Sequence, residues 1–192
     1  GGEAQVGLAL AAVGAGSMLA AVRLPRVLEH LADRPVMLSG AGLMVAGVAM
    51  TPLMPGLAGL MALWAAIGFG FSLTQTPIGR ILNRSARPGD RPAVFAAQFA
   101  LSHAGWLITY PLAGWLGSAF GLAEAAVVLA AVGAAATVAV LRLWPALDPA
   151  ELEHDHGDLP PDHPHLREGR GAAHRHAFLI DGLHPRWPRR MA

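Results

Sequence analysis

The sequence predicts an all-α fold, a polytopic membrane bundle of about five transmembrane helices. Hydrophobic residues make up 54% of the chain and charged residues 14%, and the mean hydropathy is +0.43. The apolar residues lie in long, almost uncharged runs within residues 1–146, whereas residues 147–192 are polar and rich in Pro and His. We therefore expect residues 1–146 to form a transmembrane helix bundle and residues 147–192 to be a disordered tail, because the tail lacks a core.

The apolar runs have the length that a membrane span needs. A bilayer core about 30 Å thick is crossed by roughly 20 residues of apolar helix. Five runs meet this requirement, and they cover residues 6–23, 35–54, 57–76, 93–120 and 122–144. Core helices of a soluble protein would show an amphipathic face, so five successive runs without one favour a membrane bundle.

The boundaries between the runs have physical causes. Pro35 can begin the second helix, because the first helical position needs no backbone N–H. Two Pro-containing pairs within residues 51–56 end that helix and turn the chain. Residues 87–90 form a polar turn before the fourth helix, and Gly121 separates the fourth helix from the fifth, which predicts a tight hairpin.

Small residues indicate where helices approach closely in lipid. Three pairs are spaced by four residues: Gly7/Ala11, Ala11/Ala15 and Gly42/Ala46. Gly68 and Gly70 in the third run are either packing residues or a hinge.

Arginine residues occupy alternate connections of the predicted bundle. The first and third connections hold all of the following, and the second and fourth hold none: Arg23, Arg26, Arg34, Arg80, Arg84, Arg87 and Arg91. Further Arg residues follow the fifth run. Because basic loops stay on the cytoplasmic side, we expect these two connections and the tail to be cytoplasmic and the N-terminus to be outside.

The sequence disfavours several function classes. The chain has no Cys, so it carries no disulfide and no thiol chemistry. It has no G-x-x-x-x-G-K-[ST] loop for an ATP-driven pump and no H-E-x-x-H motif for an intramembrane protease. We therefore expect no enzymatic activity and no cofactor. The basic residues form short clusters beside apolar runs, so the expected partner is the lipid bilayer and not nucleic acid.

The first connection carries a recognisable motif. Residues 31–34 read Leu-Ala-Asp-Arg. This segment resembles part of the G-x-L-A-D-R-x-G-R-R motif of the major facilitator superfamily, which follows the second helix and recurs in weaker form after the eighth. Glu29 stands where the family has its first Gly, and Val36 and Met37 stand in place of the second Gly and a basic residue. The third connection, with Pro-Ile-Gly-Arg at 77–80, resembles the family's loop between the tenth and eleventh helices.

This resemblance implies a topology and a function. The family has twelve helices with both termini in the cytoplasm, and its eighth helix runs inward, as the first run does here. The five runs then correspond to the eighth to twelfth helices, and the chain, which begins at Gly1 without Met, is a fragment whose partner is the missing N-terminal half. The implied function is secondary active transport of a small, unidentified solute by alternating access in the bacterial inner membrane, with proton-coupled efflux as one form. The alternatives are a metal-ion exporter that uses the tail and a non-transporting membrane scaffold.

The fourth run carries the strongest candidates for a substrate or proton pathway. Spacings of three and four place its polar and aromatic side chains on one broad face: Gln98, Ser102, His103, Trp106, Thr109 and Tyr110. We expect this face to point into the bundle, because lipid would leave these groups unsatisfied. His103 is either a proton relay or a packing residue that hydrogen-bonds to a neighbouring helix.

Two charged residues of the first connection are candidates for a gate. As the resemblance implies, Asp33 and Arg34 can pair with groups at adjacent helix ends and form a gating latch. The alternative is a solvated turn in which Arg34 serves topology alone.

The tail holds seven of the nine His residues. Six of them form three H-x-H pairs: His154/His156, His163/His165 and His174/His176. In an extended chain both members of a pair share a side, so each pair could chelate Zn²⁺ or Ni²⁺. His184 stands alone. The alternative is a disordered tail without a metal.

Overall fold

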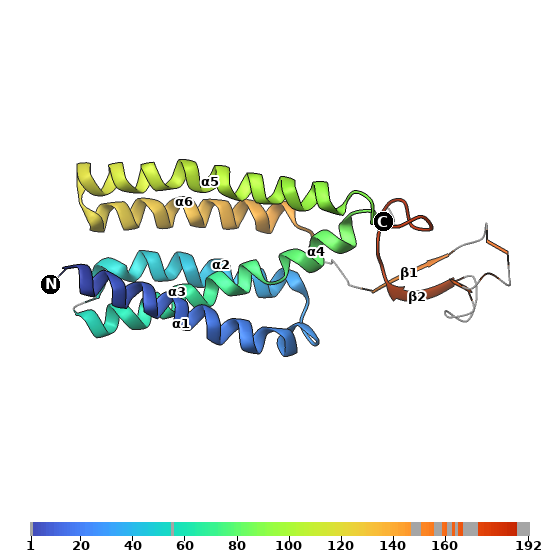
Figure 1. Ribbon diagram of the computed structural model, residues 1–192, viewed down its shortest axis with the longest axis horizontal. Coiled ribbons are helices and arrows are strands. Elements are labelled where there is room, and N and C mark those ends of the chain that lie inside the picture. The colour runs from blue at the N-terminus through green and yellow to red at the C-terminus, as the bar shows by residue number, and fades with distance from the viewer. Residues whose placement is uncertain are drawn as a thin grey trace.

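A computed structural model describes residues 2–54, 56–146, 151–155, 159–160, 163, 165–166 and 173–187. Helices α1 (Gly2–Leu28), α2 (Asp33–Met50), α3 (Leu57–Gln75), α5 (Arg91–Phe120) and α6 (Leu122–Leu143) are long. Two shorter helices join them, the 3₁₀ helix η1 (Thr51–Leu53) and α4 (Ile78–Ser85). Strands β1 (Glu151–Asp155) and β2 (Ala173–Ala177) follow. The long helices run along one axis, and the strands lie beyond one end of the bundle (Figure 1).

The prediction of a polytopic helical bundle is confirmed. Four helical segments of the described residues are long and apolar enough to cross a membrane: Gly2–Leu28, Asp33–Leu53, Leu57–Ser85 and Leu122–Leu143. Helix α5, with 30 residues, is the fifth long helix and does not belong to this group. The polar residues that single out its candidate face also lower its hydropathy.

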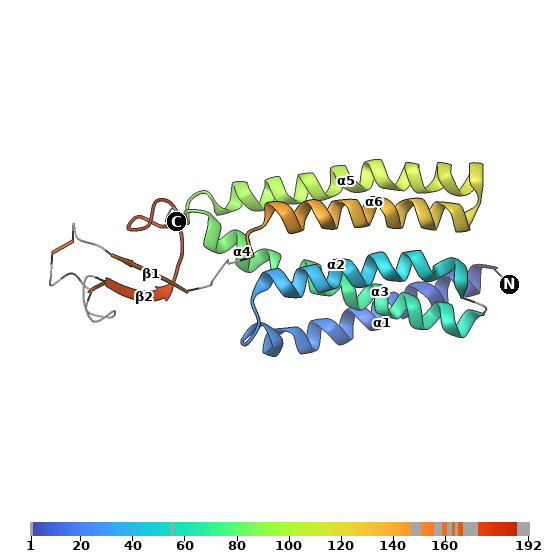
Figure 2. The same ribbon diagram turned by 180° about the vertical axis from the view of Figure 1, so that it is seen from behind.

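The helices pack in two groups. Helix α3 packs against α1 and α2, while α6 packs against α2 and α5 packs against α6. Both views show α5 at the outer edge of the bundle, on the far side of α6 from α2 (Figures 1 and 2). The hairpin predicted at Gly121 is confirmed, and Gly121 has a φ of +102°, a conformation that favours glycine.

Glycine sets the closest helix contacts, at Gly70 as one of its two predicted roles allowed and at Gly16 and Gly40, which were not predicted. A Cβ atom built on Gly16 of α1 would lie 2.7 Å from the carbonyl carbon of Ala65 in α3, and one on Gly40 of α2 would lie 2.6 Å from the carbonyl oxygen of Gly70 in α3. Gly7 and Gly42, by contrast, have no neighbouring atom within 4 Å of such a Cβ, so the pairs predicted around them were wrong. Gly70 is a packing residue in this structure.

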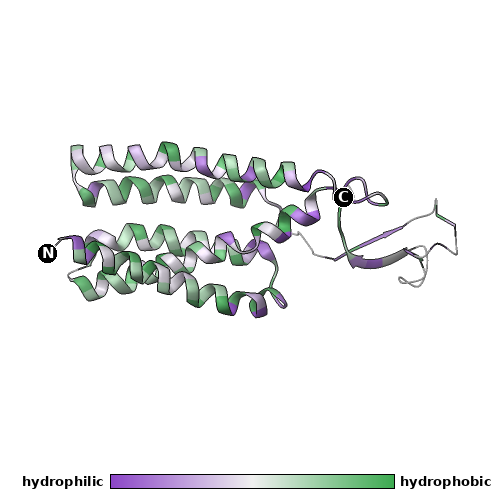
Figure 3. Cartoon of the chain, viewed as in Figure 1, coloured by the Kyte–Doolittle hydropathy of each residue, from purple (hydrophilic) through white to green (hydrophobic). Residues whose placement is uncertain are grey.

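Small residues predominate among the buried residues of the helices, and many large apolar side chains are exposed. Ala9, Ala12 and Ala20 are buried in α1, whereas large side chains such as Leu107 and Leu122 are exposed. The hydropathy colouring shows apolar residues along the length of the long helices (Figure 3). This distribution fits lipid, where helices associate through small residues and the bilayer solvates the large ones.

One end of the bundle collects the connections that carry Arg. The α1–α2 turn, α4 and the tail lie at this end, and the α2–α3 and α5–α6 turns lie with the N-terminus at the other (Figure 1). We call the first the tail end. Helix α4 begins there within the stretch that was expected to be a loop.

The tail, for which disorder was expected, contains an antiparallel strand pair. Strand β1 pairs with β2 in a register that sets Leu152 opposite His176 and His154 opposite His174. Two apolar side chains that follow β2, Phe178 and Ile180, are buried. The backbone N–H of Ile180 donates to the carbonyl of Arg84 in α4 at 3.0 Å, which fastens the segment to the bundle.

Candidate functional site

The candidate residues of α5 lie along its outer side. Gln98 and Ser102 are half-buried near α6, whereas the other four are exposed in this chain: His103, Trp106, Thr109 and Tyr110. Among the described residues, α5 packs mainly against α6 and, less extensively, against α4. The expectation that this face points into the bundle is therefore not met within the described part of the chain, because four of the six side chains are exposed there.

An aromatic stripe runs along this face. The ring of His103 lies 3.8 Å from that of Phe99 and 4.7 Å from that of Trp106, and Trp106 stacks on Tyr110 at 6.2 Å, all between centroids. We call these four residues the α5 stripe. Spacings of three and four residues along the helix bring their rings into register.

Two polar side chains of α5 hydrogen-bond to their own helix. His103 Nδ1 donates to the carbonyl of Phe99 at 2.8 Å, and the Ser102 hydroxyl donates to the same carbonyl at 2.9 Å. A carbonyl has no proton to give, so the proton of a neutral His103 lies on Nδ1 and Nε2 is an acceptor. The stripe can thus offer a hydrogen-bond acceptor and aromatic faces to whatever covers it.

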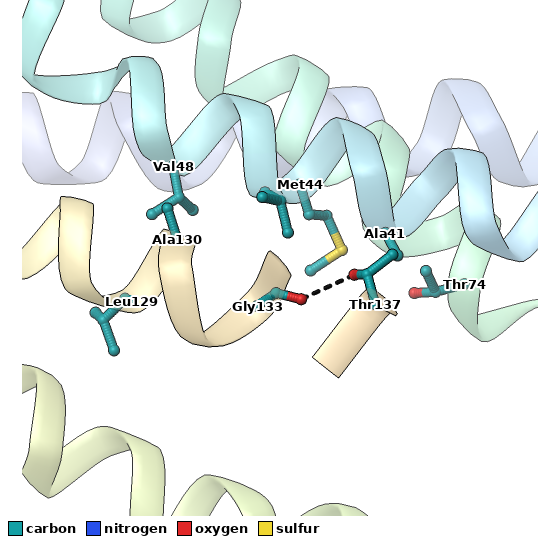
Figure 4. A pocket seen from close by; sticks show the side chains of 9 residues that line it. Ala41, Met44, Val48, Thr74, Leu129, Ala130, Gly133 and Thr137 are labelled. Atoms are coloured by element: carbon teal, nitrogen blue, oxygen red, sulfur yellow. Dashed lines mark hydrogen bonds between the residues drawn. The ribbon is translucent and has the colours of Figure 1, made fainter. Parts of the chain in front are cut away.

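A pocket of about 390 Å³ lies elsewhere, between α2, α3 and α6. Met44 of α2 points toward α6 across it (Figure 4). The lining residues are almost all apolar: Ala41, Met44, Val45, Val48, Thr74, Leu129, Ala130, Gly133 and Thr137. The two Thr hydroxyls donate to carbonyls of their own helices, at 2.7 Å for Thr74 and 2.8 Å for Thr137. The pocket includes no residue of the α5 stripe and presents little polar chemistry.

A serine pair joins α1 to α3 inside the bundle. The Ser17 and Ser72 hydroxyl oxygens lie 2.6 Å apart, and the Ser72 hydroxyl also donates to the Ser17 carbonyl at 3.0 Å. The sequence analysis missed this pair, because single Ser residues on two helices carry no pattern that links them.

Asp33 forms an ion pair across the tail end. Its carboxylate, on a residue that is 7% exposed, accepts hydrogen bonds from the guanidinium of Arg80, with Nε at 3.0 Å. Arg80 also donates to the carbonyl of Leu28 at 3.0 Å. The start of α2, the end of α1 and α4 are thereby held together.

Arg34 binds the last turn of α6. Its Nε donates to the carbonyl of Trp144 at 3.0 Å, and its Nη2 donates to the carbonyl of Leu141 at 3.2 Å. A cation at a helix C-terminus satisfies carbonyls that have no partner within the helix and complements the helix dipole. Asp33 and Arg34 therefore join α2 to two different elements at the tail end.

Four imidazoles of the tail meet in one place. One nitrogen from each lies within 4.8 Å of the corresponding atom of every other. We call them the histidine cluster: His154, His165, His176 and His184. The sequence analysis named three of these as members of separate H-x-H pairs and left His184 alone.

One of the predicted pairs, His163/His165, is divided in the structure. The ring of His163 lies outside the cluster, and its Nδ1 accepts the backbone N–H of His165 at 3.3 Å. His156 and the side chain of His174 lie outside the described residues. The apolar residues between 177 and 187 were the one sequence signal that this segment could fold and carry His184 inward.

Asp181 orients the ring of His184. Its Oδ1 accepts the His184 Nδ1–H at 2.9 Å and the backbone N–H groups of Leu183 and His184 at 2.8 and 2.7 Å. Desolvation raises the pKa of the Asp181 carboxyl, but the hydrogen bonds and the charge of His184 outweigh it and hold the pKa below its ordinary value. The stabilisation from this lowered pKa is present above the ordinary value and is lost as the pH falls through the folded one.

A comparison with protein-family models places the sequence among known proteins. It matches the Major Facilitator Superfamily over residues 1–183. This match covers the whole helix bundle and most of the tail. Comparisons with curated proteins and with solved structures give no match.

Proposed function

The chain belongs to the Major Facilitator Superfamily, and from this membership we propose that it is part of a secondary transporter that works by alternating access. The family implies an integral membrane protein and the transport of a small solute. We propose further that α1, α2, α3, α5 and α6 correspond to the eighth to twelfth helices of the family. The tail end is then cytoplasmic, in a bacterial inner membrane, and the other half of the transporter faces this chain across the solute path.

The α5 stripe is the observation that supports this proposal most. It combines His103, Trp106 and Tyr110 on a long helix whose outer side no described residue covers. Lipid would solvate Leu or Val on that side better than an imidazole and a phenol, since polar groups at membrane depth are costly without partners. We propose that the stripe faces the other half of the transporter and lines the path of the solute.

His103 is the proposed coupling residue of this path. It lies near the middle of α5, and its Nε2 is an acceptor that can take up a proton when the path opens to water. Proton uptake at this position couples solute movement to the proton gradient, with efflux as the proposed direction.

Asp33 and Arg34 are the proposed gating residues at the tail end. Their contacts with α4 and α6 hold one side of the bundle as a unit, and alternating access moves such a unit as a rigid body. The Asp33–Arg80 pair also fixes the end of α1 through the Leu28 carbonyl.

The proposal is tested by transport through the intact transporter that contains this chain. Proteoliposomes would be loaded with a panel of labelled small solutes, and flux would be driven by an imposed proton gradient. We expect His103→Ala to abolish proton-driven flux, His103→Gln to retain solute binding without proton coupling, and Ile108→Ala to leave flux unchanged. Equal flux for all three variants between about pH 5.5 and 8 would reduce His103 to a packing residue.

A further inference from the structure

The histidine cluster lies apart from the proposed solute path and needs an explanation of its own. We propose that it binds one divalent transition-metal cation of the zinc class, which fastens the tail to α4. This inference does not depend on the transport role of α5. The proposed site is a single one, whereas the sequence predicted three separate H-x-H chelates.

The fold brings the four rings together from separate segments. His154 lies on β1 and His176 on β2, one diagonal step apart in the strand register, and their ring centroids are 4.6 Å apart. His165 comes from the connection between the strands, and His184, 4% exposed, comes from the turn that follows β2. Convergence from this many segments is typical of a metal site and costs chain entropy that a bound cation offsets.

Hydrogen bonds orient three of the rings with Nε2 toward the cluster centre. His154 Nδ1 lies 3.1 Å from the Leu152 carbonyl, His176 Nδ1 lies 2.8 Å from the Ala177 carbonyl, and His184 Nδ1 lies 2.9 Å from the Asp181 carboxylate. These oxygens accept and cannot donate, so each Nδ1 carries a proton and each neutral ring presents a lone pair at Nε2. Metal-bound histidines have this arrangement, in which an outer carbonyl or carboxylate fixes the tautomer.

One of two short distances between Nε2 atoms matches the edge of a coordination sphere, and the other is shorter. His165 and His176 approach at 3.3 Å and His154 and His184 at 2.9 Å, both between Nε2 atoms. A tetrahedron with metal–nitrogen bonds of about 2.0–2.1 Å has nitrogen–nitrogen edges of roughly 3.3–3.4 Å. Two Nε2 lone pairs at 2.9 Å repel each other unless a proton or a metal cation lies between them, and four imidazoles suit Zn²⁺, Ni²⁺ or Cu²⁺.

The site is mechanically connected to the bundle. The ring of Phe178 lies 4.9 Å from that of His184 and 4.9 Å from that of Trp187, and the guanidinium of Arg84 lies 5.6 Å from the centroid of Trp187. The Ile180 N–H bond to the Arg84 carbonyl adds a backbone contact between the two. A cation that holds the histidine cluster therefore holds residues 176–187 against α4.

Calorimetry on the full 192-residue chain tests the site. The chain, purified in detergent with a tag that contains no His and stripped with chelator, is titrated with zinc chloride at pH 7.5. We expect one Zn²⁺ per chain, and a Co²⁺ complex with the intense visible bands of a tetrahedral site. His184→Asn and His165→Asn, on different segments, should each lose stoichiometric binding, whereas the matched change His30→Asn in the α1–α2 turn should retain it.

A second measurement reports on the tail itself. Hydrogen exchange of residues 173–187 should slow on addition of zinc in the parent chain and should not respond in His184→Asn. Three results would overturn the proposal. Absence of zinc binding would leave a proton shared between imidazoles, and two or three ions per chain with His184→Asn unaffected would assign binding to the H-x-H pairs. The third is zinc binding without any change in hydrogen exchange.

Discussion

The contact between α1 and α3 gives a sharp prediction about stability. In Gly16→Ala the new Cβ would overlap the carbonyl oxygen of Ala65 and lie 2.7 Å from its carbonyl carbon, where an ordinary contact begins at 3.4 Å. The obstacle is backbone, so no rotamer change relieves it, and α1 and α3 must move apart at this contact. The Ser17–Ser72 hydrogen bond, now 2.6 Å long, stretches with them.

The expected cost follows from opposing terms. Overpacking of a helix contact costs about 1–3 kcal/mol, and a weakened interhelical hydrogen bond adds about 0.6 kcal/mol. Alanine is the better helix former by about 1 kcal/mol, which offsets part of this. We therefore expect Gly16→Ala to lower the free energy of unfolding by about 0.6–2.6 kcal/mol.

Gly14→Ala, on the same helix, is the matched control, because a Cβ built on Gly14 meets no neighbouring atom within 4 Å. It should be neutral or stabilising by up to about 1 kcal/mol. Both free energies can be measured by denaturant titration of the chain in mixed micelles, followed by circular dichroism. Equal stability of the two variants would mean that α1 and α3 are not in backbone contact at Gly16.

Three further predictions concern the tail end and the topology. Arg80→Ala should destabilise the chain more than Asp33→Asn, by roughly 1–3 kcal/mol in the same titration, because it leaves a buried carboxylate without its counter-ion; the reverse order would contradict the ion pair. Asp181→Asn should weaken zinc binding about 10–100-fold in calorimetry without changing the stoichiometry, since it removes the carboxylate that orients His184, and unchanged affinity would deny that role. The chain has no Cys, so single Cys variants can be labelled with a membrane-impermeant maleimide. Gly56→Cys should be labelled in intact cells, and Gly89→Cys should be labelled only after the cells are permeabilised. The opposite pattern would reverse the orientation.

The helices could be predicted from the sequence because each apolar run reports its own place in the chain, although α1 (Gly2–Leu28) extends beyond the predicted 6–23 at both ends. Their partners could not, because small residues occur on several faces of each helix. Gly7 and Gly16 look alike in the sequence, yet a Cβ on Gly16 alone would meet α3. Helix α4 was missed because eight residues in a basic connection are too few to show a span.

The candidate residues divide in the same way. The α5 face could be predicted, since helical spacing alone aligns His103 with Trp106 and Tyr110. The histidine cluster could not, because three of its members come from different predicted pairs and His184 from none. Contacts between distant segments depend on strand register and on docking against α4, and neither is encoded in local spacing.

Water accessibility of α5 is the most direct test of the proposed solute path. Tyr110 and Ile108 are 68% and 69% exposed in this chain and differ by two residues in depth, but they project from nearly opposite sides of the helix. In the intact transporter, Tyr110→Cys should react with a small water-soluble thiol reagent, faster on one side of the transport cycle, and Ile108→Cys should not react. Reaction at Ile108→Cys with protection at Tyr110→Cys would contradict the account, because the α5 stripe would then be packed away from water.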